Sequence, residues 1–231
     1  MQTVFRMKRR YIFFGVLLCF FTVSRAQINE LGVFLGGSNY VGDIGKDNYI
    51  WPNSFAGGLV YKWNMHPRFA IRSNYTYTKL TADDANSDNS FRKERGLDFA
   101  NDLHDFAVGI EFNFFKYNLD KLGYTQTPYI VLQAGVANYA VRSDADGTSG
   151  GRTFNFVLPF GLGYKFKLAP NVGVAIESTF RYTFKDDIDG YPYTDGNGVE
   201  IGYSNGNDWY VFTGISVVYA FGRPGCYTGS F

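Results

Sequence analysis

The sequence predicts an all-β fold, a closed eight-stranded antiparallel transmembrane β-barrel, and three observations support this prediction. Aromatic residues make up 19% of the 231 residues and glycine contributes 27 of them, a composition typical of β-proteins rather than helical bundles or disordered chains. Large apolar residues recur at every second position over long segments, which is the period of a β-strand. Short connections alternate with long polar ones, as in barrels that cross the bacterial outer membrane.

The N-terminus has the pattern of a secretory signal peptide. A basic cluster, Lys8-Arg9-Arg10, precedes an apolar run over residues 11–23, and small residues lead up to an expected cleavage after Ala26. The apolar run is shorter than the roughly 20 residues that a membrane-spanning helix needs. The expected division of the chain is a signal peptide at 1–26, a barrel at 27–221 and a C-terminal tail at 222–231.

Cleavage changes the charge and the cysteine content. It removes five of the 22 basic residues and no acidic residue, which leaves 17 against 21 and a net charge of −4. This balance gives no support to nucleic-acid binding, which needs a basic excess. Cys226 becomes the single cysteine, so no internal disulfide can form.

Eight segments of the exported chain are expected to be strands. In chain order they are 30–40, 53–64, 69–79, 103–115, 128–141, 153–168, 172–184 and 207–221. The connections at 65–68 and 169–171 are short turns, whereas 41–52, 80–102, 142–152 and 185–206 are longer and polar. The 116–127 connection is longer than its expected short-turn role. We expect no helix in any of them.

The alternation is clearest in four of these segments. In 153–168, eight large apolar residues from Phe154 to Leu168 alternate with small or polar ones. Similar patterns run through 103–115 and 172–184. The last segment places Trp209, Val211, Ile215, Val217, Tyr219 and Phe221 opposite Gly214, Ser216 and Ala220.

The bulky face of these strands needs an apolar cover. Each large side chain gains about 1.5–3 kcal/mol on leaving water. A fully wet face on the 153–168 segment would therefore forgo more than about 10 kcal/mol, comparable to the whole stability of a domain, about 5–15 kcal/mol. Membrane lipid is the simplest cover, since most segments reach the ~9–11 residues of a membrane-spanning strand. The soluble alternative is a lipocalin-like barrel with its aromatic residues inside.

The opposite face carries charged residues that would point into the lumen. They are Lys62, Arg72, Asp105, Glu111, Lys165, Lys167, Glu177 and Arg181. Eight strands enclose room for side chains only, so these groups are expected to pair into a solid polar core. The alternative is a narrow ion path lined by the same groups.

Enzyme and metal chemistry find little support. The two histidines, His66 and His104, are not paired with a serine nucleophile by any recognisable motif. Two acidic stretches, 144–147 and 187–190, lack the later acidic ligand of a full calcium loop. We therefore expect no catalytic residues, no metal and no cofactor.

The C-terminal tail carries the only remaining thiol. Glycine and proline prevent the tail from extending the last strand. An exposed thiol in an oxidising compartment tends to find a partner. The hypothesis is an intermolecular disulfide or a partner contact on the periplasmic side, formed by Cys226 with Arg223, Tyr227 and Phe231. The alternative is a disordered tail.

Several stretches resemble one known family. They are Glu30–Val33, Gly36–Tyr40 with Gly42-Asp43, Glu111–Phe115, Leu158–Tyr164, and Arg181–Phe184 with Asp186-Asp187. Together they resemble the PorG-like outer-membrane barrels of the Bacteroidetes type IX secretion system, over most of the exported chain. The resemblance implies a non-enzymatic component that anchors a periplasmic ring of a PorK-like lipoprotein and a PorN-like protein to the outer membrane. It also makes the tail around Cys226 the natural place for a link to that ring.

The function expected from the sequence is therefore that of an assembly anchor. The barrel would be held by outer-membrane lipids, with both termini in the periplasm. Periplasmic turns and the tail would hold the ring proteins. The alternative is a stand-alone OmpA- or OmpW-like barrel that acts as an adhesin or as a narrow pore.

Overall fold

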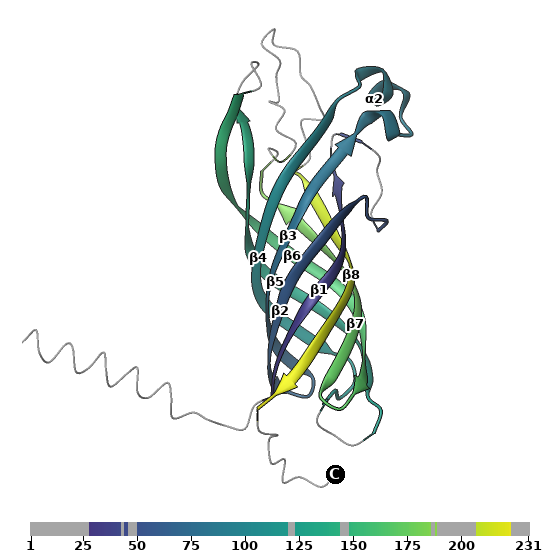
Figure 1. The fold of residues 1–231 in the computed structure, drawn as a ribbon, viewed down its shortest axis with the longest axis vertical. Helices are drawn as coiled ribbons and strands as arrows, with labels where there is room; N and C mark the ends of the chain where they lie inside the picture. Colours follow the sequence, from purple (N-terminus) through teal and green to yellow (C-terminus); the bar gives the residue numbers. More distant parts are fainter. Residues whose placement is uncertain are drawn as a thin grey trace, which may run out of the picture.

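The computed structural model describes a closed barrel of eight antiparallel strands in consecutive order, which confirms the predicted fold class (Figure 1). It describes residues 28–42, 44–45, 50–119, 123–143, 148–185, 188 and 207–222. The strand β1 pairs with both β2 and β8, so the sheet closes on itself. Closure leaves no unpaired sheet edge over the height at which all eight strands pair.

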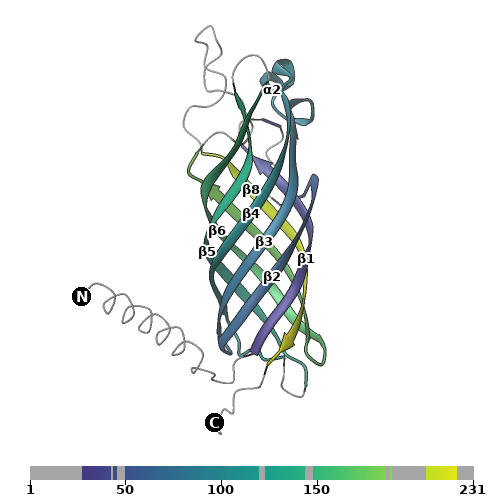
Figure 2. The same cartoon turned by 60° about the vertical axis from the view of Figure 1, so that its left-hand side comes forward.

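The eight strands match the eight predicted segments with shifted ends. Their bounds are β1 Ile28–Val41, β2 Ser54–His66, β3 Phe69–Asp83, β4 Asp98–Asn113, β5 Gln126–Ser143, β6 Thr148–Ala169, β7 Val172–Thr183 and β8 Trp209–Phe221. The chain enters β1 and leaves β8 at the end that also bears the β2–β3, β4–β5 and β6–β7 connections (Figure 2). We call this the terminal end and the opposite one the loop end.

The expectation of no helix is wrong in the connection between β3 and β4. A short 3₁₀ helix, η1 Asp84–Asn86, and an α-helix, α2 Ser90–Arg95, lie there. Asn89 caps α2 by accepting a hydrogen bond from the Phe91 N–H, and Gly96 ends it in the left-handed conformation. These local signals lie in a polar stretch without a long apolar stripe. Among the described residues, no helix is long and apolar enough to cross a membrane.

The alternation places the bulky face outside. On β6, Phe154, Phe156, Leu158, Phe160, Leu162, Tyr164 and Leu168 are all exposed. Between them, Asn155, Val157 and Lys165 are buried in the lumen. The lipocalin-like alternative, which needs the aromatic face inside, is therefore wrong. Val211 of the last strand keeps the outward register, in the row of Phe160 and Phe180, but its side chain is buried.

Small residues on the inner face allow the tight curvature of the barrel. A side chain at Gly109 would place its Cβ only 2.2 Å from the Leu132 carbonyl oxygen. At Gly161 the Cβ would lie 2.4 Å from the carbonyl oxygen of Ser178. Glycine thus lets neighbouring strands approach closely where the sheet coils.

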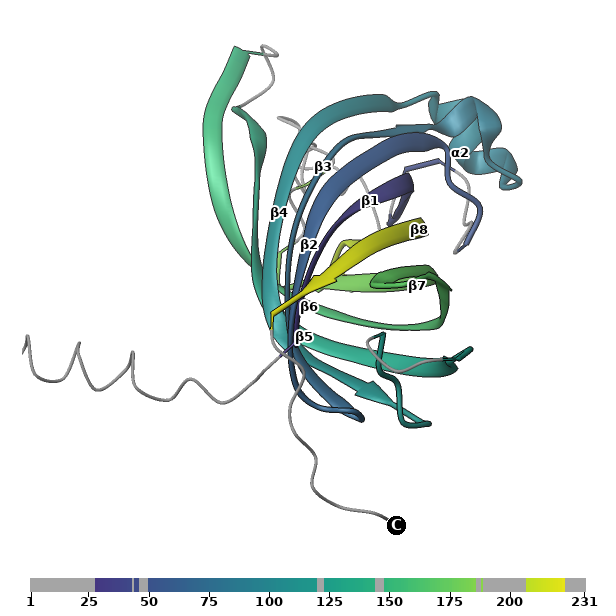
Figure 3. The same cartoon turned by 60° about the horizontal axis from the view of Figure 1, so that its bottom comes forward.

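The wall of the barrel is taller on the side of β3 to β6. In the described residues, β5 pairs with β4 only up to Asn138, and β6 pairs with β7 only up to Val157. Beyond these points β5 and β6 continue as a two-stranded ribbon that stands out at the loop end (Figure 3). Asn101 ties the ribbon to β4, since its amide donates to the Ala140 carbonyl at 2.8 Å and accepts from the Ala140 N–H at 3.0 Å.

Candidate functional site in the barrel lumen

Glu111 is the centre of an ionic cluster in the terminal half of the lumen. This β4 carboxylate is fully buried and lies 2.8 Å from Lys62 Nζ of β2. It also pairs with Lys165 of β6, and Arg72 of β3 approaches it at 3.4 Å. One carboxylate therefore ties together four strands that lie far apart in sequence.

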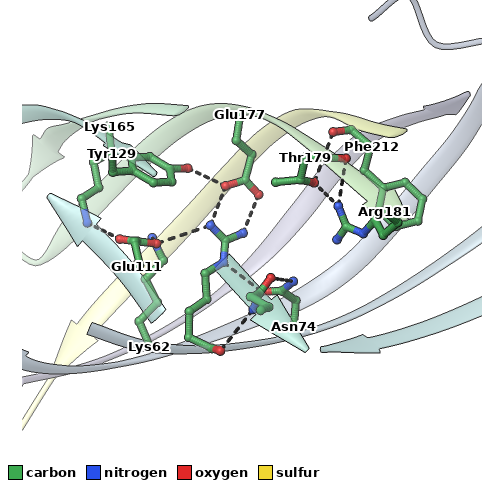
Figure 4. Close-up of polar contacts among 11 residues, drawn as sticks. Lys62, Asn74, Glu111, Tyr129, Lys165, Glu177, Thr179, Arg181 and Phe212 are labelled. Carbon is green, nitrogen blue, oxygen red and sulfur yellow. Dashed lines mark hydrogen bonds and ion pairs between the residues drawn. The ribbon is translucent and has the colours of Figure 1, made fainter. Parts of the chain in front are cut away.

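Arg72 extends this cluster to Glu177 on β7, which Figure 4 labels between Tyr129 and Thr179. Its Nη1 and Nη2 donate to the two carboxylate oxygens of Glu177 on β7 at 2.7 and 2.6 Å. The Tyr129 hydroxyl of β5 donates to the same carboxylate at 2.5 Å, and Arg72 Nε donates to Asn74 Oδ1 at 2.8 Å. A planar guanidinium that binds both carboxylate oxygens is the strong form of such a pair.

Amide side chains complete the hydrogen bonding around Arg72. Asn74 Nδ2 donates to Gln133 Oε1 at 3.1 Å. Gln133 Nε2 donates to the backbone carbonyl of Arg72 at 3.2 Å. The network thus fixes the cation from several strands, as buried charges require.

The β4–β5 connection closes the terminal end of the lumen. Tyr117 and Leu119 turn inward and pack against Val218 and Ala220 of β8. The Tyr117 N–H donates to the Pro67 carbonyl at 3.0 Å, and the Lys165 ammonium lies 4.4 Å from the centre of the Tyr117 ring. Burial, with the negative charges of Glu30 and Glu111, raises the pKa of the Tyr117 phenol. This connection is longer than a turn because it acts as a stopper.

The loop half of the lumen is built differently. The Tyr210 hydroxyl donates to Asp105 Oδ2 at 2.6 Å, and Arg181 Nε lies 3.6 Å from the same oxygen. Arg181 also donates to Thr179 and lies over the Phe212 ring at 4.3 Å. The Asp105–Arg181 ion pair is here embedded among aromatic rings.

A hydrophobic core surrounds Arg181 in the loop half of the lumen. Its buried members are Phe34, Tyr40, Ile44, Ala56, Val60, Leu80, Phe99, Leu103, Ala137, Tyr139, Val157, Ile188, Tyr210 and Phe212. Asp208 fastens the connecting segments above it, because it accepts hydrogen bonds from the Tyr40 hydroxyl and from the Ile188 N–H. The described residues thus fill the loop half of the lumen as well.

A small cavity lies between the two halves. Its volume is about 10 Å³, and both Arg72 and Arg181 line it together with Glu177, Thr179 and Phe212. A cavity needs about 10–15 Å³ to hold one water molecule. The described part of the lumen at this level therefore has no room for a continuous water column.

The residues singled out from the sequence fall into three groups. Lys62, Arg72, Asp105, Glu111, Lys165, Glu177 and Arg181 are all buried in the lumen, and Lys167 is half-buried near its terminal end. Although Glu177 and Arg181 face the same side of β7, they pair with Arg72 and Asp105 respectively. The tail residues Arg223, Cys226, Tyr227 and Phe231 lie outside the described residues, as does the expected signal peptide.

Sequence reasoning missed several participants. Glu30 of β1 is buried and accepts a hydrogen bond from Asn64 Nδ2 at 2.9 Å. Tyr129 and Gln133 of β5 complete the shell around Arg72. The available signal was their position, since all three share the inward register of their strands.

Both histidines make hydrogen bonds with neighbouring groups on the outer surface. His104 Nδ1 hydrogen-bonds with the Tyr75 hydroxyl, and His66 Nδ1 accepts from the Arg68 N–H. No cluster of three potential metal ligands occurs among the described residues. The 144–147 stretch lies outside them, and only Ile188 of the 187–190 stretch is described.

Comparison with known proteins places the chain in a family. A family model described as a domain of unknown function, DUF6089, matches residues 9–230. The chain therefore belongs to the DUF6089 family. No curated protein sequence matches it.

Several solved structures share the barrel architecture. Neisserial surface protein A is 10% identical, with a TM-score of 0.48 over 84% of this chain and 96% of that one. A major outer membrane protein from Thermus thermophilus is 14% identical, with a TM-score of 0.45 over 85% and 100% of the two chains. The outer membrane protease OmpT from Escherichia coli is 10% identical, with a TM-score of 0.39 over 86% and 98%. These likenesses concern the fold alone.

Proposed function

We propose that this DUF6089-family barrel sits in the bacterial outer membrane as a non-enzymatic attachment point rather than as a channel. The observation that carries the proposal is the filled lumen. Ion pairs join opposite walls in one half, a hydrophobic core fills the other, and the β4–β5 connection closes the terminal end. A barrel without a free lumen acts through its outer surfaces.

The exterior supports placement in a membrane. Leu35, Leu59, Ile110 and Leu132 are each more than half exposed, and they belong to four different strands. The outward apolar face thus extends around the barrel and would be costly to leave in water. The closed sheet also satisfies its own backbone hydrogen bonds, which a lipid environment demands.

The finer proposal concerns the partner. From the resemblance to PorG-like barrels, we propose that the terminal end holds the periplasmic ring of a type IX secretion system, made of a PorK-like lipoprotein and a PorN-like protein. The tail with Cys226 is the proposed contact, through a disulfide or a non-covalent surface. Lipid confinement raises the effective concentration of the partners, so each contact can be weak.

Conductance tests the closed lumen. The purified barrel, inserted into planar bilayers, should give no stepwise conductance. An open channel would contradict the attachment proposal and favour the stand-alone pore. The same preparation should require detergent or lipid to stay monodisperse, and a monodisperse chain in plain buffer would contradict the membrane placement.

Co-purification tests the partner. The ring proteins should co-purify with the wild-type chain from crosslinked envelopes, and a Cys226→Ser variant should lose any disulfide-linked band on non-reducing gels. An unchanged band pattern would exclude the disulfide. Absence of the ring proteins from the wild-type sample would exclude the anchoring role and leave the membrane placement intact.

A further inference from the structure

Outward side chains of β3 to β6 form rows of paired residues that run across the four strands. The rows become more polar toward the loop end. The first row is apolar apart from one hydroxyl and runs through Tyr75, Phe106, Val136 and Phe156. The second row runs through Tyr77, His104, Asn138 and Phe154. Beyond it lie Lys79 opposite Asp102, and Arg152 opposite Ala140. We call Tyr77, Lys79, Asp102, His104, Asn138 and Arg152 the wall patch.

Hydrogen bonds hold the patch in a fixed shape across four strands. Arg152 Nε donates to Asn138 Oδ1 at 2.6 Å, and Arg152 Nη2 donates to the Asp102 carbonyl at 3.0 Å. The Tyr77 hydroxyl donates to the Asp102 carboxylate at 3.1 Å. The guanidinium is therefore anchored by two of its nitrogens, and its orientation on the wall is set in advance.

The patch keeps cationic donors available. Among the described residues, neither Lys79 Nζ nor Arg152 Nη1 has a hydrogen-bond partner. The one carboxylate of the patch, Asp102, already accepts from Tyr77. Two cations and one acid give the patch a positive balance, and both cations are exposed.

The opposite wall lacks this arrangement at the matching boundary. There Tyr182 of β7 pairs with Trp209 of β8, with ring centres 4.8 Å apart. No lysine or arginine occurs on the outward face of described β7 or β8. Within the described strands these cations thus lie on one wall, whereas the exposed Lys185 follows the end of β7.

We propose that the wall patch binds the phosphate of a lipid headgroup in the leaflet at the loop end, with the acyl chains lying along the apolar row below. This inference rests on the proposed membrane placement. Lysine and arginine are the natural donors to phosphate oxygens, and a fixed guanidinium loses little entropy on binding. The order from apolar to aromatic to cationic rows matches the order of acyl chain, interface and headgroup.

The probe is bisphosphorylated lipid A, added to the barrel in a phosphate-free maltoside detergent and measured by native mass spectrometry. The wild-type barrel should bind it, and the double variant Lys79→Gln/Arg152→Gln should bind on the order of tenfold more weakly. The matched control is Lys93→Gln/Lys185→Gln, which removes two exposed cations from the loop end outside the patch. Heat-modifiable mobility, the difference between unboiled and boiled samples on SDS gels, verifies that each variant is folded.

Equal weakening in the two double variants, or no weakening in either, would overturn the proposal. Dephosphorylated lipid A should bind the wild-type barrel about as weakly as phosphorylated lipid A binds the patch variant, and equal binding of both lipids would also overturn it. Inorganic phosphate in millimolar excess should not displace the lipid, since it lacks the acyl contacts. Displacement would assign the patch to a free phosphate ion instead. Loss of the detergent requirement would contradict the membrane placement itself.

Discussion

The two halves of the lumen hold the barrel together by different means. In the terminal half, Glu111 and Glu177 are bound by three cations that reach across from other strands. In the loop half, aromatic rings and aliphatic side chains pack as they would in a soluble core, with one ion pair at their edge. A narrow barrel can thus be filled by paired charged side chains or by packed apolar ones. The first filling is destabilised by loss of a countercharge and the second by loss of side-chain volume.

The largest expected effect comes from removing the anion that several cations share. Glu111→Gln leaves Lys62 and Lys165 buried without the carboxylate that both contact, and we expect a loss of about 3–5 kcal/mol in the free energy of unfolding. Urea-induced unfolding in lipid vesicles measures it. Glu94→Gln on the exposed face of α2 is the control, with a change within about 0.5 kcal/mol. A small effect at Glu111 would mean that the ion pairs do not hold the terminal half together.

In the loop half, the matched test removes volume. Phe212→Ala deletes a buried ring that contacts Phe34, Tyr210 and Arg181, and we expect a loss of about 3 kcal/mol or more. The loss should be insensitive to salt, because it arises from packing. Phe91→Ala, at an exposed position, serves as the control. A loss under about 1 kcal/mol at Phe212 would show that the loop half is loosely packed.

A smaller loss of stability is expected at Asn101, whose side chain bonds the backbone of Ala140 where the β4–β5 backbone pairing has ended. Asn101→Ala removes hydrogen bonds to Ala140 and to the Ile188 carbonyl, which should cost about 1–3 kcal/mol. Amide hydrogen exchange at Ala140 should accelerate, since its N–H loses its acceptor. Exchange at Val131, lower on the same strand, should stay slow. Unchanged exchange at Ala140 would show that another group fastens the ribbon.

The smallest effect is expected at the stopper of the terminal end. The Tyr117 hydroxyl is buried without a hydrogen-bond partner among the described residues, so Tyr117→Phe should leave stability at neutral pH equal or slightly higher. Because burial raises the pKa of this phenol, the folded barrel keeps it neutral while the unfolded chain ionises near its ordinary pKa of about 10. The wild-type barrel should therefore lose stability as the pH rises above that value, and the variant should lose less. Identical alkaline denaturation profiles would contradict the burial of the ring.

The same comparison shows what the sequence could predict. Period two separates small and polar residues from bulky ones, so the charged residues of the terminal half were predictable as a set. Their pairing was not, because register and closure decide which strands meet across the lumen. The bulky core of the loop half was missed, since Trp209–Phe212 is bulky at four consecutive positions and period two cannot say which residues face inward.

Strand ends and helices were harder to predict for a related reason. The ribbon of β5 and β6 extends beyond its neighbours, so nothing in the pattern of the adjoining strands marks where it stops. The helix α2 depends on local capping by Asn89 and Gly96 and has no apolar stripe of its own. Such elements are set by a few hydrogen bonds, which composition and periodicity do not report.

The most direct test of the account asks what touches the outer face of β6. A nitroxide label is attached at Leu162→Cys in a background where Cys19 and Cys226 are serine, and the barrel is reconstituted in vesicles. Power saturation should show high collision with oxygen and low collision with a water-soluble nickel chelate, because lipid surrounds this exposed side chain. Ready access of the nickel chelate to Leu162 would place water against the bulky face and contradict the membrane-spanning barrel.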